Sequence, residues 1–469
     1  MTEQPRPPVA RRGRISRAAP LLGAAARTAG EAVVASLRGG RGAEFHGRAA
    51  ERYAQRLGRS KGVLMKAGQL MSFAGFGPAM EGEYAHVYRA ALSRLQDDAP
   101  PMPYPMAAGM VAVELGAPPE ELFAAFDREP LAAASIGQVH AATLRDGRRV
   151  AVKIQYPGVE EAIRADLSNT ELLVSFFSLA RSMIPSMTRM DMRALAREAA
   201  ERIGEELDYR AEAAHQAEFA EIYRGHPFIR VPDVVPELCS DRVLTMELAE
   251  GMRWSRALTA DAGLRDRWGE AVYRFTLGSL RRLGLFHADP HPGNYLFHED
   301  GTVTFLDFGC VKRFAPHQIR QIRAMVTAAV DDDPAAFAGA LHDAGLVTSD
   351  GDGAPGPADL LAWFRATLHS VVGPQPHTYG PEQSARTMQT AFSVSGEHGP
   401  VLRRVSLPPD FLFLTRIEMG MNAVLGELRC TGPWLDVLNE WDRNGPPATP
   451  YGELDQTFWK ERHDGRSIS

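Results

Sequence analysis

Two aspartates and one asparagine stand close together in two short stretches, HADPHPGN and LDFG. Asp289 precedes Asn294 by five residues, and Asp307 follows the apolar segment 303–306. Carboxylate and amide oxygens are hard ligands that suit Mg²⁺, and because Mg²⁺ usually keeps several waters, two protein ligands can suffice. Asn294 and Asp307 could therefore hold a metal ion, while Asp289 could orient a nucleophile and accept its proton. These residue types favour magnesium-dependent phosphoryl transfer.

A lysine in the middle of a predicted strand could bind the phosphates in such a reaction. Lys153 lies in VAVKI, where strand alternation places it on the opposite face from Val152 and Ile154. A lysine there needs a counter-charge or a phosphate. The preceding segment, AAASIGQVH, has the small residues that let a backbone approach a phosphate chain. It lacks the GxGxxG pattern, so a simple turn before a hairpin is the alternative.

The order of these motifs is more specific than any one of them. Asp289 and Asn294 have the spacing of the kinase catalytic-loop pattern HRDxxxxN, and Asp307 opens a DFG motif further along the chain. The alternative is a buried loop that uses Asp and Asn as turn formers, with DFG arising by chance. A strand lysine, DxxxxN and DFG in this order favour a kinase-like nucleotide site.

A kinase lysine also needs a glutamate to position it. The helical stretch EELDYRAEAAH offers four acidic residues, Glu205, Glu206, Asp208 and Glu212. Asp208 and Glu212 are one turn apart and share a helix face. The alternative is a solvated acidic helix that pairs with Arg202 and Arg210, and the residues alone leave both interpretations open.

The elements that must position these residues run from helices to a small sheet region and back to helices, which indicates an α+β fold. SIGQVHAATL and RVAVKIQ, joined by the turn RDGR, predict a β-hairpin. IRVPDVV and DRVLTMEL predict two further strands. Helical patterns cover roughly 158–224, the region up to Leu283, and the chain from Phe314 onward.

Composition limits the function classes. The 469 residues are 45% hydrophobic and 23% charged, which is typical of a globular protein with ample core material. The longest apolar run is too short to span a bilayer, and the polar N-terminus shows no secretory signal. The three cysteines are far apart and lack metal or disulfide spacing. We therefore expect a cytoplasmic protein in a reduced setting, with no transmembrane segment.

The net charge of −6 is unevenly distributed, because residues 1–60 carry twelve Arg and four Glu. These arginines are not interleaved with aromatics, which argues against nucleic acid as a partner. A helix between Pro20 and Gly39 would place Leu22, Val33 and Leu37 on one face. Such a helix could contact an anionic membrane peripherally or pack against the rest of the protein.

Over about residues 14–430 the chain resembles the UbiB-type (AarF-type) atypical kinases, a family linked to isoprenoid quinone biosynthesis. The motifs that carry the resemblance are KAGQ, LSRLQDDAPP, AAASIGQVH, VAVKIQYPGV, EELDYRAEA, VLTMELAEG, FHADPHPGN and LDFG. KxGQ and the alanine-rich loop together are highly specific, since ordinary protein kinases and small-molecule kinases lack both.

The resemblance implies a two-lobed, atypical protein-kinase-like α+β fold. A helical N-terminal extension carrying KxGQ would cover 1–115. An N-lobe with a small sheet and inserted helices would cover 116–255. A helical C-lobe with the catalytic loop, DFG and C-terminal helices would cover 256–469.

The resemblance also assigns roles around ATP or ADP and Mg²⁺. Lys153 would bind the α- and β-phosphates with Glu212 as its helix partner, Asp289 would be the catalytic aspartate, and Asn294 and Asp307 would be metal ligands. The alanine-rich loop would alter nucleotide preference; it comprises Ala132, Ala133, Ala134, Ser135, Ile136 and Gly137. The hinge that meets adenine would comprise Glu247, Leu248, Ala249 and Glu250.

The family's distinctive feature is an extension that folds over the site where a peptide substrate would lie. Lys66 and Gln69 of KAGQ would reach the nucleotide pocket, with Glu206 and Asp208 facing the lysine. This chain departs from the family at His215, where an asparagine is usual, which bears on local packing or metal contact. No APE motif follows DFG, so an ordinary peptide-docking segment is not expected.

These features favour an ATP-binding atypical kinase or ATPase that supports ubiquinone or related isoprenoid-lipid metabolism. A nucleotide-binding regulator with a conformational output, and a small-molecule kinase, are the alternatives. KAGQ argues against the small-molecule kinase. Expected partners are a nucleotide and either an isoprenoid lipid or quinone-pathway enzymes.

Overall fold

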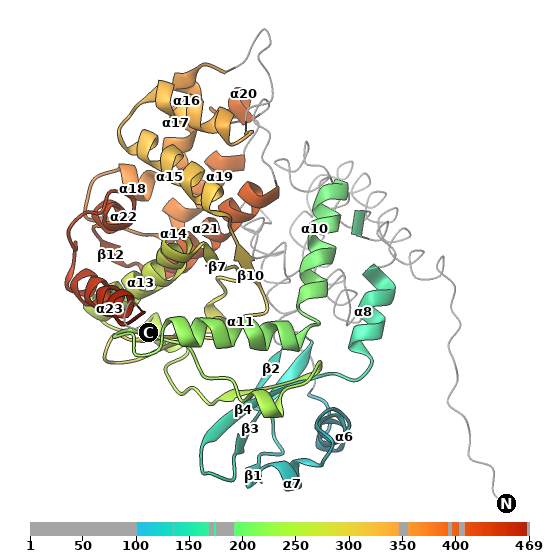
Figure 1. Cartoon of the computed structure of the whole chain (residues 1–469). Coiled ribbons are helices and arrows are strands. Elements are labelled where there is room, and N and C mark those ends of the chain that lie inside the picture. Colours follow the sequence, from blue (N-terminus) through green and yellow to red (C-terminus); the bar gives the residue numbers. More distant parts are fainter. Residues whose placement is uncertain are drawn as a thin grey trace, which may run out of the picture.

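A computed structural model describes residues 101–134, 136–167, 173–174, 192–346, 355–392, 396–402 and 409–466. A small sheet forms one lobe and a larger, mainly helical body forms the other, with helix α11 running between them (Figure 1). The predicted α+β, two-lobed kinase-like fold is confirmed by this arrangement.

The sheet of the smaller lobe contains five strands within the described residues, in the order β1-β3-β4-β6, with β2 also paired to β3. All of its pairings are antiparallel. The strands are β1 (Ala125–Phe126), β2 (Ala132–Ala134), β3 (Gly137–Thr143), β4 (Arg149–Gln155) and β6 (Val243–Glu247). The predicted hairpin is β3–β4, and Gly147 of its turn has a φ of 91°. Glycine adopts such a left-handed conformation without steric cost.

Two helices precede and cover this sheet, namely α6 (Tyr104–Leu115) and α7 (Pro119–Leu122). Ala107 and Val111 of α6 are fully buried and share a hydrophobic core with Val152 and Ile154 of β4. Buried Gln138 accepts from the amide of Met102 and donates to its carbonyl. The chain entering α6 is thus joined directly to the strand that follows the alanine-rich segment.

The predicted helical region after the hairpin contains α8 (Val159–Leu167), α10 (Met192–Glu205) and α11 (Tyr209–Ile222). Asp208 begins α11 as its N-cap, because its carboxylate accepts from the amide of Ala211 at 2.9 Å. The helix buries Glu212 toward the small sheet and Phe219 in the core of the larger lobe. α11 therefore contacts both lobes.

The larger lobe has two small sheets close to the DFG motif. One has the order β5-β9-β8, with β5 (Ile229–Arg230) parallel to β9 (Val303–Phe305) and β8 (Tyr295–Phe297) antiparallel to it. The other pairs β7 (Leu285–His287) with β10 (Val311–Arg313). The strand predicted over IRVPDVV is limited to Ile229–Arg230, because the two prolines near it have no amide to donate to a ladder.

Helices make up the rest of this lobe. They are α12 (Trp254–Ala257), α13 (Ala262–Tyr273), α14 (Ser279–Leu283), α15 (Pro316–Val330), α16 (Pro334–Asp343), α17 (Pro357–Thr367), α18 (His369–Val372), α19 (Pro381–Phe392), α20 (Gly399–Leu402), α21 (Pro409–Leu428), α22 (Trp434–Asp442) and α23 (Pro450–Arg466). A short pair of strands, β11 (His377–Thr378) and β12 (Thr431–Gly432), joins two of the connections. Pro begins α15, α16 and α17, where its missing amide costs nothing.

Candidate active site

Lys153 lies at the centre of the candidate site, between two carboxylates. Its Nζ donates to both oxygens of Glu212, at 2.7 and 2.9 Å, and lies 3.4 Å from Oδ2 of Asp307. The side chain of Glu212 is 2% exposed and that of Asp307 is 41% exposed. A strand, a helix and the DFG segment thus converge on one ammonium group, and the predicted pairing of Lys153 with Glu212 is present.

The ionisation of this pair follows from its surroundings. Burial lowers the pKa of Lys153, but the charges of Asp307 and Glu212 outweigh burial and hold that pKa well above its usual value. Burial raises the pKa of Glu212 to about 7, and the charge of Lys153 acts against that rise. Because both carboxylate oxygens of Glu212 accept from Nζ, we assign an ionised pair.

Asp307 is presented by an unusual backbone conformation. Its φ is 59°, in the left-handed region, and its Oδ1 accepts from the amide of Gly309 at 3.2 Å. Two imidazoles face the backbone carbonyls of Asp307 and Phe308. Nε2 of His287 lies 2.8 Å from the Asp307 carbonyl, and Nδ1 of His215 lies 3.2 Å from the Phe308 carbonyl. His215, at the position that departs from the family pattern, therefore contacts the DFG backbone.

Asp289 and Asn294 lie together in the loop between β7 and β8. The Nδ2 of Asn294 donates to Oδ2 of Asp289 at 2.8 Å and to its carbonyl at 3.2 Å. The amide of Leu306 donates to the Asn294 carbonyl at 2.8 Å, which joins this loop to the residue just before Asp307. The structure thus brings the predicted catalytic aspartate and both predicted metal ligands onto adjoining backbone segments.

The alanine-rich segment is a strand followed by a tight turn. Ala132, Ala133 and Ala134 form β2 and pair with Val139, Gln138 and Gly137 respectively. Ile136 is buried, and a Cβ added to Gly137 would lie 2.2 Å from the carbonyl oxygen of Ile154. Val139 is also the β3 partner of Lys153 in β4. This register places the alanine-rich strand next but one to the strand that carries the lysine.

The predicted hinge connects the two lobes. Glu247 ends β6 opposite Val150, and the amide of Leu248 donates to the carbonyl of Arg149 at 3.0 Å. Glu250 pairs with the guanidinium of Arg149. Ala249 lies between these contacts and is partly buried. Two residues further on, Met252 pairs with Phe297 of the larger lobe, so the segment passes from one lobe to the other.

Comparison with known proteins supports the same interpretation as this geometry. Residues 94–340 match the ABC1 atypical kinase-like domain. The chain belongs to this family. The match spans the small sheet, α11, the catalytic loop, DFG and the first helices of the larger lobe. The UbiB-type resemblance of the sequence motifs is thereby confirmed, since the relatives of this ABC1 chain include proteins named COQ8 and aarF domain-containing kinases.

Individual relatives of the ABC1 family are identical to this chain at about one aligned residue in three. The chain is 36% identical over 278 residues to the chloroplastic protein Activity of BC1 Complex Kinase 1 of Arabidopsis thaliana, covering 57% of this chain and 39% of that protein. It is 34% identical over 278 residues to the mitochondrial atypical kinase COQ8 of Saccharomyces cerevisiae, covering 59% of this chain and 53% of that protein. The chain therefore spans about half or less of the length of these relatives.

A solved structure matches more of the chain. The erythromycin complex of Rv3197 from Mycobacterium tuberculosis is 30% identical, with a TM-score of 0.61, and the alignment covers 85% of this chain and 97% of that one. The similarity therefore extends beyond the ABC1 domain into the C-terminal helices.

Several predicted ABC1 site residues lie outside the described part of the chain or at the edge of the site. Lys66, Gln69 and Ser135 lie outside the described residues, as does the arginine-rich N-terminal region. Glu206 is partly buried in the turn before α11, close enough to help raise the pKa of Glu212. Asp208 is exposed and caps α11, a role that the sequence analysis did not assign to it.

Two residues of the site were missed by the sequence analysis. Tyr209 is fully buried, and its ring lies 4.9 Å from Nζ of Lys153, which gives the ammonium group a cation–π contact. His287 is buried against the DFG backbone. Both stand inside motifs that the sequence analysis quoted, EELDYRAEA and FHADPHPGN. Position within these motifs was the available signal, but a tyrosine or histidine in such a stretch fits a packing role equally well.

The donors present suit a hard cation. Asp307 offers a carboxylate and Asn294 an amide oxygen, which is the sparse protein ligation that Mg²⁺ accepts alongside waters and phosphates. Within the described residues, no group of three or more His, Cys, Asp or Glu side chains could hold a metal by itself. None of the helices in that same part of the chain is both long and apolar enough to cross a membrane.

Proposed function

We propose that the protein binds ATP or ADP with Mg²⁺ and transfers or hydrolyses the terminal phosphoryl group. The observation that carries this proposal is the Lys153–Glu212 pair with Asp307 beside it. A buried lysine that is held by one enclosed carboxylate can bind the α- and β-phosphates without losing its counter-charge. Asp307, which is more exposed, is available to a cation.

The chain's own residues divide the chemistry between them. Lys153 would orient the phosphates, and Asp307 and Asn294 would hold Mg²⁺, which when bound offsets phosphate charge. Asn294 holds one oxygen of Asp289, which leaves the other to accept a proton from the attacking hydroxyl or water. The Ala132–Ala134 strand and the turn at Gly137 would lie along the nucleotide, and the segment Glu247–Glu250 would contact its base.

The proposed biological role is support of ubiquinone or related isoprenoid-lipid metabolism, as the resemblance to UbiB-type kinases suggests. Lys66 and Gln69, with Glu206 and Asp208, are proposed to regulate the site by excluding a peptide substrate. Peripheral contact of the N-terminal region with anionic membranes fits a lipid-linked role. Loss of co-sedimentation with anionic vesicles at low salt on deletion of residues 1–40 would support that contact, and unchanged binding would exclude it.

The central test removes the charge of Asp307. Asp307→Asn keeps the side-chain shape but removes the carboxylate that would face the cation, so we expect nucleotide affinity to lose its dependence on Mg²⁺. Binding of a fluorescent ATP analogue, measured with and without Mg²⁺, reports this directly. Affinity that keeps its full Mg²⁺ dependence in the variant would exclude Asp307 as a ligand.

A matched control and a labelled substrate sharpen this test. Asp300→Asn makes the same change at an exposed residue of the β8–β9 turn that pairs with Arg230, and it should bind like the parent. Tracing labelled γ-phosphate then separates the alternatives. Label on a protein or small molecule indicates a kinase, label released as phosphate indicates an ATPase, and binding without turnover indicates a regulator.

A further inference from the structure

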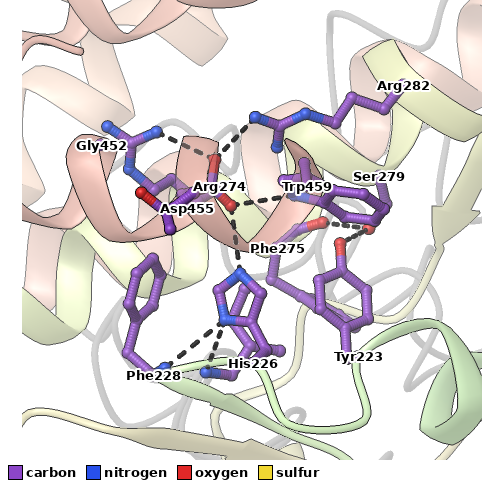
Figure 2. A network of polar contacts seen from close by, with 12 residues as sticks. Tyr223, His226, Phe228, Arg274, Phe275, Ser279, Arg282, Gly452, Asp455 and Trp459 are labelled. Carbon is purple, nitrogen blue, oxygen red and sulfur yellow. Dashed lines mark hydrogen bonds and ion pairs between the residues drawn. The ribbon is translucent and has the colours of Figure 1, made fainter. Parts of the chain in front are cut away.

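A buried polar cluster lies at the C-terminal end of α11, well away from Lys153. It joins His226, which follows α11, to Asp455 and Trp459 of α23, and beside it the hydroxyl of Tyr223 is hydrogen-bonded to Ser279 (Figure 2). α23 lies beyond the segment that matches the ABC1 domain. The same helix α11 carries Glu212 near its other end, and the eleven residue steps from Glu212 to Tyr223 span about 16 Å.

Asp455 is the centre of this cluster. Its carboxylate is 1% exposed and lies within 2.7 to 3.4 Å of four donors. These donors are Nε2 of His226, Nε1 of Trp459, and the guanidinium groups of Arg274 and Arg282. An isolated buried carboxylate would be costly, so this set of donors is what makes its burial stable. Although burial raises the pKa of Asp455, the hydrogen bond from His226 and the charges of Arg282 and Arg274 lower it to about 2.

His226 transmits this contact to the connection that leaves α11. Its Nε2 faces Asp455, so its Nδ1 is the acceptor for the amides of Phe228 and Ile229, at 3.4 and 3.2 Å. Ile229 begins β5, which pairs with β9 just before DFG. One imidazole therefore fixes the residues between α11 and the strand beside the DFG segment.

Aromatic packing connects the cluster to the active site. The ring of Trp459 lies 5.9 Å from that of Tyr223, and Phe219 lies 6.4 Å from Tyr223. Phe219 in turn lies 5.1 Å from Phe308, the phenylalanine of DFG. All of these rings are buried. Close-packed rings of this kind resist independent movement, because displacement of one opens a cavity beside the next.

The helix opposite α11 has an irregular turn at the same place. Residues Arg274–Gly278 form a π-helical turn between α13 and α14, and such turns often occur at functional sites. Arg274 from this turn reaches Asp455 and forms two hydrogen bonds with buried Glu440, both at 2.8 Å. Phe275 from this turn packs against Phe219 and Tyr223. The irregular turn thus directs Arg274 toward α23 and Phe275 toward the C-terminal end of α11.

From this geometry we infer that Asp455 is a positioning residue for the Lys153–Glu212 pair. By binding His226, and by holding the ring of Trp459 of its own helix beside Tyr223, it fixes α23 against the C-terminal end of α11. α11 is thereby fixed at the end opposite Glu212. Arg462 adds a contact on the outside of this junction, where its guanidinium donates to the carbonyl of Glu221. This inference rests on the proposed nucleotide-binding function of the site.

The test compares Asp455→Asn with Glu453→Gln. Both changes remove one negative charge from α23, but Glu453 is exposed and lies outside the cluster. Asp455→Asn should raise the KM for ATP by about twofold to thirtyfold, the range expected for coupling between connected sites, while Glu453→Gln should leave it unchanged. Hydrogen exchange of the amides in 209–216 should also become faster in Asp455→Asn, measured well below its melting temperature.

A purely structural role for Asp455 gives a different result. It would lower the melting temperature but leave the KM for ATP and the exchange of 209–216 at parental values, and that outcome would overturn the inference. If Asp455→Asn does not fold, Arg462→Ala tests the same junction from its partly exposed edge, and the same two readouts should change in the same direction. Parental values in that variant would count equally against it.

The two proposals fail separately. A parent protein that binds no nucleotide would overturn the proposed function, and the positioning of a nucleotide site with it. A parent that binds Mg²⁺ and ATP, with unchanged KM and exchange in Asp455→Asn, would overturn the positioning role alone. Measuring the parent first therefore assigns any negative result to one proposal.

Discussion

The two carboxylates that face Lys153 differ in exposure, and this difference separates their roles. The side chain of Glu212 is 2% exposed and is therefore shielded from solvent. The side chain of Asp307 is 41% exposed, and its Oδ2 lies 3.4 Å from Nζ of Lys153. Removing Glu212 would leave a buried ammonium group short of its main partner, a change that is strongly destabilising in enclosed pairs. Asp307 can turn toward a cation while Glu212 keeps the lysine charged. Lys153 can thus keep its buried ion pair with Glu212 and still bind a phosphate group.

Gly137→Ala, which adds a single methyl group, would test whether the turn after the alanine-rich strand needs its close approach to β4. The Cβ of Gly137→Ala would lie 2.2 Å from the Ile154 carbonyl oxygen, which belongs to backbone and cannot rotate away. The turn must therefore shift, and we expect a loss of about 1 to 3 kcal/mol in the free energy of unfolding. Nucleotide affinity should fall as well, because the displaced turn adjoins the strand that carries Lys153. Urea unfolding and fluorescent-nucleotide titration measure the two effects.

Gly109→Ala is the control for this change. Gly109 lies within α6, and nothing stands within 4 Å of an added Cβ. Alanine is favoured over glycine inside a helix, so this variant should gain about 0.5 to 1 kcal/mol and bind nucleotide like the parent. Equal stability losses in the two variants would show that the close approach at Gly137 is not the cause.

At the scale of elements, the first turn of α11 depends on Asp208. Its Oδ1 accepts from the amide of Ala211, which satisfies one of the free donors at the helix start. Asp208→Ala should therefore cost about 1 kcal/mol in the free energy of unfolding, whereas Asp208→Asn, which keeps the cap, should cost only a few tenths. Denaturation in about 0.5 M salt, which screens the helix dipole and surface charges, isolates the capping effect.

The same pair of variants separates capping from the proposed contact between Asp208 and Lys66. That contact needs the negative charge, which asparagine lacks. If Asp208→Asn proves as damaging to nucleotide affinity as Asp208→Ala while stability is retained, the charge is the important feature. If stability and nucleotide affinity both decrease in the order Asp, Asn, Ala at position 208, capping of α11 accounts for the effect of this residue.

An element was predictable when residues close together in the sequence determine it, and was not predictable when it depends on contacts with distant parts of the chain. The β3–β4 hairpin follows from alternation and an Asp-Gly turn, both local signals, and it was predicted with the correct turn. The alanine-rich segment was expected as a loop, but Ala132–Ala134 form a strand, because β3 offers a pairing edge that sequence alone does not reveal. The strand at Ile229 is two residues long for the opposite reason, since nearby prolines remove donors.

Within the site, the charged residues that the structure brings together were predictable, but those that position them were not. Lys153, Asp289 and Asp307 stand in motifs whose spacing is informative. Tyr209 contacts Lys153 through its ring, and tyrosine has too many uses in proteins for its type to indicate that contact. Asp455 was not singled out, because its partner His226 is 229 residues away and no periodic pattern relates the two.

At the scale of the whole molecule, the junction of α11 and α23 should make stability depend on acidity. Burial lowers the pKa of His226, and Arg282 and Arg274 lower it further, against the opposing effect of Asp455. The unfolded chain therefore takes up a proton near the usual pKa of 6.5 while the folded chain resists it, so stability falls as pH falls below that value. The lowered pKa of Asp455 adds a further loss as pH falls from 3.8 toward about 2.

His226→Gln tests this dependence, because the glutamine amide can still donate to Asp455 but does not titrate. Between about pH 7 and pH 5 the parent should lose more free energy of unfolding than the variant, by at most about 1.4 kcal/mol per pH unit. Comparing slopes removes other titrating groups, including Glu212, which are common to both proteins. Identical slopes would show that His226 takes up its proton equally in both states.

The contact between His226 and Asp455 also has a consequence for how the chain is made. Among the described elements α23 is the last to leave the ribosome, after α11 and the π-helical turn have already been synthesised. Until then Arg274 has Glu270, one turn earlier, and Glu440 of α22 as partners, but its contact with Asp455 of α23 does not yet exist. Contacts of such long sequence separation form late and slowly. The larger lobe is therefore completed only after translation of α23, and until that moment the nascent chain exposes the aromatic surface that α23 later covers.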